Sequence, residues 1–121
     1  MIRLLVAASL LLASPALACL EHSFPEHGSE THINDNRVEL EFTDVVDIAT
    51  VAATVTDEKG RQVSTGELKR GEDNKTVFVM LRPQDPQGRM GYEAGMYVVQ
   101  WRVGHGDVEH HGKFTFRVHK H

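Results

Sequence analysis

Cysteine, aromatic residues and excess positive charge are all scarce in this chain of 121 residues. A single Cys excludes an internal disulfide framework and a cysteine-based zinc ribbon. Thirteen Lys and Arg against seventeen Asp and Glu give a formal net charge of −4. Non-specific nucleic-acid binding needs dense positive charge, so we exclude that class of protein. The 40% hydrophobic content is enough for one modest core and favours a single ordered domain.

Histidine is the abundant residue type, with eight copies against two Tyr and one Trp. The histidines form an N-terminal group, a group near the last strand and a C-terminal pair: His22, His27, His32; His105, His110, His111; His119, His121. Neutral imidazole is a ligand for copper, zinc and nickel. The composition therefore suggests a metal-binding protein.

Residues 1–18 have the pattern of a cleaved secretory signal peptide. Arg3 precedes an apolar run from Leu4 to Ala13, and the segment closes on the small residues Ala16 and Ala18. The run is too short to cross a hydrocarbon core of about 30 Å. We expect a mature domain over 19–121 that lies outside the cytoplasm and begins at Cys19. A cysteine at that position also fits lipid attachment, so an exported lipoprotein remains open, and the chain would contact a membrane only if Cys19 is lipidated.

Short strands separated by turns account for the rest of the chain. Apolar residues alternate with polar ones in several segments, which is typical of half-buried strands. Gly, Pro and Asp mark the turns, and the long segment Arg82–Glu93 reads as a loop, as does Gly104–His111. The pattern predicts an all-β antiparallel sandwich or barrel, with the aromatic residues of its last two strands in the core. The expected strands are Arg37–Thr43, Ile48–Thr56, Arg61–Thr65, Lys75–Leu81, Tyr97–Val103 and Phe114–Val118.

Four motifs, in this order, resemble the CopC family of bacterial periplasmic copper-resistance proteins. They are Leu20-x-x-Ser23-x-Pro25-x-x-Gly28, Val38-x-Leu40-x-Phe42, Gly95-x-Tyr97-x-Val99-x-Trp101 and Gly112-x-Phe114-x-Phe116-x-Val118. The resemblance implies a small Greek-key β-barrel of immunoglobulin-like shape in the periplasm. It also implies a protein that buffers or transfers copper for resistance and homeostasis, with an inner-membrane copper transporter as a candidate partner.

The sequence departs from this family at the positions that would hold copper. The family's Cu(II) site uses an N-terminal histidine and an Asp-x-His before the last strand. Here Leu17 and Cys19 stand where the family often has the histidine, and Gly106 and Val108 occupy the Asp-x-His positions. The family's Cu(I) site uses a methionine-rich loop, whereas the methionines of this mature chain are scattered at Met80, Met90 and Met96. The ligands therefore cannot be transferred residue by residue.

Other residues of the same two regions are candidate ligands, and we expect Cu(II) rather than Cu(I). If the N-terminal segment packs near the final loop, as the resemblance implies, the metal ligands are His22, His105, Asp107, His110 and His111. We expect His27 to be outside the site and His32 to lie on the surface. No hydrolase, phosphate-loop or dinucleotide motif is present, so we expect no enzyme. The alternatives are a solvated polar loop and a metal-free immunoglobulin-like binding or assembly module on the same scaffold.

Overall fold

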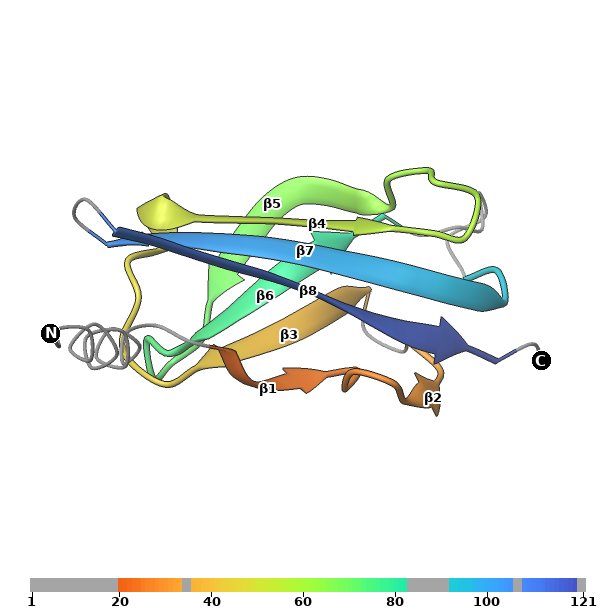
Figure 1. Ribbon diagram of the computed structural model, residues 1–121, viewed down its shortest axis with the longest axis horizontal. Coiled ribbons are helices and arrows are strands. Elements are labelled where there is room, and N and C mark those ends of the chain that lie inside the picture. The colour runs from red at the N-terminus through yellow and green to blue at the C-terminus, as the bar shows by residue number, and fades with distance from the viewer. Residues whose placement is uncertain (1–19, 34–35, 83–91, 106–107, 120–121) are drawn as a thin grey trace, which may run out of the picture.

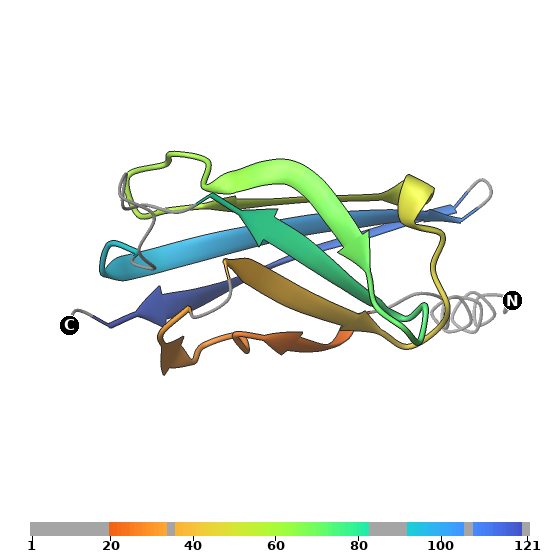
Figure 2. The same ribbon diagram turned by 180° about the vertical axis from the view of Figure 1, so that it is seen from behind.

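Two four-stranded sheets pack face to face in the computed structural model (Figures 1 and 2), which describes residues 20–33, 36–82, 92–105 and 108–119. The expected signal peptide, Cys19, Gly106, Asp107 and His121 lie outside these ranges, as does most of the loop expected at Arg82–Glu93. One sheet has the strand order β1-β3-β6-β5, and the other has β2-β8-β7-β4. The strands are β1 (Leu20–Phe24), β2 (Glu30–Thr31), β3 (Arg37–Phe42), β4 (Val51–Thr56), β5 (Ser64–Arg70), β6 (Thr76–Leu81), β7 (Gly95–His105) and β8 (Val108–Val118).

The core is built by the inward-facing residues of the alternating strands. Val38, Leu40 and Phe42 of β3 are completely buried, and their polar neighbours are not. From the other sheet, the rings of Tyr97 and Phe116 stack with their centroids 5.5 Å apart. This confirms the expected all-β sandwich of immunoglobulin-like type. Across the described ranges, no helix has the length and apolar character needed to cross a membrane.

The N-terminal segment joins the two sheets. Strand β1 pairs antiparallel with β3, whereas β2 pairs parallel with β8 in the opposite sheet. At the crossing the Gly28 N–H donates to the Thr115 carbonyl at 2.7 Å, and the Arg117 N–H donates to the Ser29 carbonyl at 2.9 Å. These hydrogen bonds hold the segment that carries the N-terminal histidines along one edge of β8.

The prediction of a loop at Gly104–His111 was wrong. Strands β7 and β8 continue through this region as a hairpin, in which Val103 pairs with His110 and His105 pairs with Val108. Only residues 106 and 107 separate the two strands. One face of an antiparallel sheet can meet water, so polar residues at the end of a hairpin do not prevent pairing.

Two strand boundaries also differ from expectation. Ile48–Thr50 form a 3₁₀ turn, η2, before β4, because the Asp47 carboxylate accepts the Ala49 N–H at 3.0 Å and caps the turn. The strand expected at Arg61–Thr65 begins instead at Ser64 and runs to Arg70. Arg61 belongs to the preceding turn, where its N–H donates to the Asp57 carboxylate at 2.9 Å.

Asp57 is a structural carboxylate at that turn. It accepts the Lys59 N–H at 3.0 Å and the Arg61 Nε–H at 2.9 Å, and its side chain is almost fully buried. Burial by itself raises the pKa of Asp57, but the hydrogen bonds and the Arg61 charge outweigh it and hold the pKa below its usual value. The carboxylate of Asp57 is therefore used to hold the turn, through the backbone and the Arg61 side chain.

Both tyrosines should ionise at an unusually high pH. Burial raises the pKa of Tyr92 and of Tyr97 to about 12, from an ordinary value of about 10. A raised pKa means that the neutral tyrosines stabilise the fold fully below about pH 10, and that this stabilisation is lost as the pH rises through about 12. We expect the tyrosinate absorbance of the folded chain to rise at a pH about two units higher than that of the urea-unfolded chain. Ionisation of the folded chain near pH 10 would contradict this assignment.

Candidate metal site at the β7–β8 hairpin

Strand β8 places His110 and His111 on opposite faces of its sheet. Successive side chains of a strand alternate, so His110 lies on the same side as the buried residues Phe114 and Phe116. His111 lies on the outer side with Lys113 and is exposed. The two adjacent histidines, both predicted as ligands, therefore cannot bind one ion through a continuous strand.

His110 has an unsatisfied imidazole nitrogen. The ring is half-buried, and its Nε2 is shielded from solvent without a hydrogen-bond partner in the described part of the chain. Leaving a buried polar atom without a partner costs about 1–3 kcal/mol, so such an atom in a native structure calls for a ligand or a water. His110 is thus the described histidine best prepared to accept a metal ion.

Gly112 of β8 and Trp101 of β7 pack against each other close to His110. A Cβ atom added to Gly112 would lie 2.8 Å from Cζ2 of Trp101, so only glycine lets the indole ring lie against β8. The ring also packs edge-on against Phe42, with centroids 5.5 Å apart. Trp101 is therefore partly buried, as its place in the alternating pattern predicted, and it lies close to the inner face that His110 shares.

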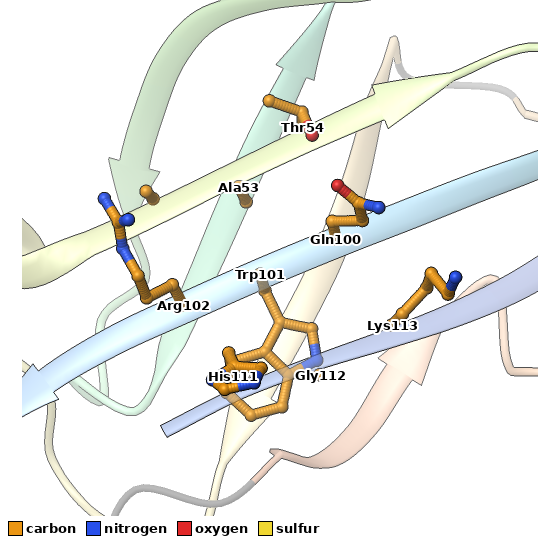
Figure 3. A pocket seen from close by; sticks show the side chains of 9 residues that line it. Ala53, Thr54, Gln100, Trp101, Arg102, His111, Gly112 and Lys113 are labelled. Atoms are coloured by element: carbon orange, nitrogen blue, oxygen red, sulfur yellow. The ribbon is translucent and has the colours of Figure 1, made fainter. Parts of the chain in front are cut away.

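His111 belongs to a different feature, a groove of about 600 Å³ on the outer face of the sheet (Figure 3). Three rows of paired residues line it, Ala52–Arg102–His111, Ala53–Trp101–Gly112 and Thr54–Gln100–Lys113. The small residues of β4 leave the groove open, and Arg102 and Lys113 place positive charge beside His111. These cationic neighbours disfavour a metal cation at His111, although Arg102 is paired with Glu109 at 3.1 Å.

His22 is exposed on β1, where it is paired in register with Glu41 of β3. It lines a separate groove of about 240 Å³ together with His27 and Phe114. His27 accepts the Thr115 N–H through Nδ1 at 3.2 Å, so its neutral ring carries the proton on Nε2 and has no lone pair to offer a metal there. This geometry supports leaving His27 out of the site.

The described ligand candidates are not brought together. His22, His110 and His111 lie on different surfaces, and the described ranges contain no group of three or more His, Cys, Asp or Glu placed to hold a metal ion. Asp107 and the side chain of His105 lie outside the described part of the chain, so the five-residue ligand set stays a prediction. His32, expected on the surface, is half-buried instead, because its ring packs against that of His119.

Comparison with known proteins agrees with the all-β sandwich architecture. A model of the CopC domain matches residues 20–119. The chain belongs to the CopC family, as its four motifs suggested. No curated protein matches it significantly in sequence.

Solved structures share the fold at low sequence identity. PcoC, a methionine-rich copper resistance protein from Escherichia coli, has a TM-score of 0.68 and 22% identity over 84% of this chain and 98% of that chain. CopC from Methylosinus trichosporium OB3b has a TM-score of 0.67 and 21% identity over 84% of this chain and 92% of that chain. These likenesses confirm the sandwich fold.

Proposed function

We propose that this chain is a periplasmic copper-resistance protein that binds Cu(II) without catalytic turnover and buffers or transfers it. Membership of the CopC family supports copper as the cargo. The observation that carries the proposal is the buried, unpartnered Nε2 of His110 beside the hairpin turn. Cu(II) favours nitrogen and oxygen donors in a tetragonal arrangement, and imidazole is among the best of these.

The remaining donors are proposed from residues near the same hairpin. We propose His105 and Asp107, which are close to His110 in the sequence, and His22 with the terminal amine of Cys19 from the N-terminal segment. His111 faces the outer groove, so we assign it no place at the ion that His110 binds. An ion held by one ordered imidazole and exchangeable donors suits transfer to a partner, for which we propose an inner-membrane copper transporter. Nitrogen ligands must be deprotonated, so binding should weaken as the pH falls.

Trp101 provides a direct test, because it is the only tryptophan of the chain. Its ring lies against Gly112, which is two residues from His110 on the same face of β8. Cu²⁺ bound at His110 should quench Trp101 fluorescence and saturate at one ion per chain, in a protein lacking residues 1–18. Zn²⁺, which is not paramagnetic, serves as the control and should leave most of the fluorescence. A signal that does not saturate below about tenfold excess of Cu²⁺ would favour the metal-free binding module instead.

A further inference from the structure

Strand β2 and the end of β8 lie at the end of the sandwich opposite the β7–β8 hairpin (Figures 1 and 2). The side chains of Glu30, His32 and His119 lie close together there. His119 follows β8, and its N–H donates to the carbonyl of Thr31 in β2 at 3.0 Å. Glu30 and His32 flank Thr31, so the parallel pairing of β2 with β8 brings all three side chains to one place. The N-terminal and C-terminal histidine groups thus have one member each at this end.

The two imidazole rings have a spacing that a shared metal ion requires. The ring centroids of His32 and His119 are 5.1 Å apart, and the planes are tilted by 46°. With metal–nitrogen bonds of about 2.0–2.1 Å, two imidazoles on one tetrahedral or square-planar ion place their ring centres about 5 Å apart. The observed centroid spacing matches that of two imidazoles on one ion.

Glu30 prepares His119 for this role. Its Oε2 lies 3.3 Å from Nδ1 of His119, so the carboxylate faces that nitrogen and a metal ion would bind through Nε2. A histidine that binds a metal commonly donates its other ring N–H to a carboxylate, which fixes the ring and strengthens the ligand. His27, by contrast, accepts the Thr115 N–H through Nδ1 and has no carboxylate at that position in the described part of the chain.

We infer that His32 and His119 form a second transition-metal site, distinct from the proposed copper site at the other end of the sandwich. Its ligand is a divalent ion that favours imidazole, such as Zn²⁺, Ni²⁺ or Cu²⁺, with water in the remaining positions. Two protein ligands give a weaker, more exchangeable site than the three or four of a structural zinc site. The bound ion ties the short strand β2 to the end of β8, and so fastens the N-terminal segment to the C-terminus.

Zn²⁺ titration followed by NMR tests this inference on the chain lacking residues 1–18. We expect Zn²⁺ to shift the imidazole resonances of His32 and His119, and to slow hydrogen exchange severalfold at the amides of Arg117 and His119, which bond to the β2 segment. His119→Ala and His32→Ala should each weaken this binding about tenfold or more, and Glu30→Gln severalfold, because the amide replaces the orienting carboxylate. Zn²⁺ binding of unchanged affinity in His119→Ala would overturn the inference.

Two controls separate this site from folding defects and from the copper proposal. His27→Gln keeps a side-chain acceptor for the Thr115 N–H and should leave Zn²⁺ binding at His119 unchanged. His110→Ala should also leave it unchanged, since that residue is at the opposite end of β8. If the amide spectra of the His32 and His119 variants match that of the parent chain, lost binding supports the site. If His110→Ala abolishes the shifts at His119, the two ends share one ion and the inference of a second site is wrong.

Discussion

The His110→Ala variant should lose the high-affinity Cu²⁺ site, with an affinity lowered by about 100-fold or more. Its Nε2 is a buried nitrogen without a hydrogen-bond partner in the ranges the structure describes, and alanine removes that donor altogether. The change should not destabilise the fold much, because the imidazole is only half-buried and contributes an unsatisfied polar atom. The measurement is a Cu²⁺ titration followed by Trp101 quenching and by the EPR spectrum.

His111→Ala is the matched control. It removes an imidazole from the adjacent position of the same strand, but from the outer face, where Arg102 and Lys113 line the groove. Cu²⁺ affinity and quenching should stay within about twofold of the parent chain. Equal losses in the two variants would mean that the alternation along β8 does not decide which histidine binds, and the proposed role of His110 would fail.

Replacement of Phe42 by alanine should destabilise the fold strongly, by about 3–5 kcal/mol. Phe42 is completely buried and its ring packs edge-on against Trp101, so its loss leaves a cavity beside Trp101. Phe24→Ala provides the control, because Phe24 is 56% exposed and should change stability by less than about 0.5 kcal/mol. Urea unfolding of both variants gives the comparison, and similar losses would show that the core is not centred on Phe42.

The loss of core packing at Phe42 should also change the fluorescence of Trp101 near the proposed copper site. Because Trp101 rests on Phe42 and Gly112, the Phe42→Ala chain should show altered Trp101 emission even where it remains folded. Copper quenching should then change in amplitude more than in stoichiometry, since His110 itself is retained.

The strands were predictable from the sequence because alternation reports burial directly. Val38, Leu40 and Phe42 gave β3, and Phe114 with Phe116 gave the second half of β8. The first half of β8 was missed because glycine and histidine carry little apolar signal. Extending the same alternation backward through Gly112 would have placed His110 on the inner face and separated it from His111.

The pairing of β2 with the end of β8 could not be predicted from the alternation of apolar residues. His32 and His119 meet because β2 lies parallel to β8, with Glu30 opposite Arg117 and Thr31 opposite Val118. A two-residue strand has almost no sequence pattern, and its partner is distant in the chain. The register of such a contact depends on the crossing at Gly28, which only the three-dimensional structure reveals.

Anomalous diffraction at the copper absorption edge, from crystals of the chain grown with one equivalent of Cu²⁺, tests the central proposal most directly. The proposal predicts a copper peak about 2.0 Å from Nε2 of His110, at the β7–β8 hairpin and on the inner side of β8. A copper peak that lies away from His110, whether in the outer groove beside His111 or only at His119, would contradict it.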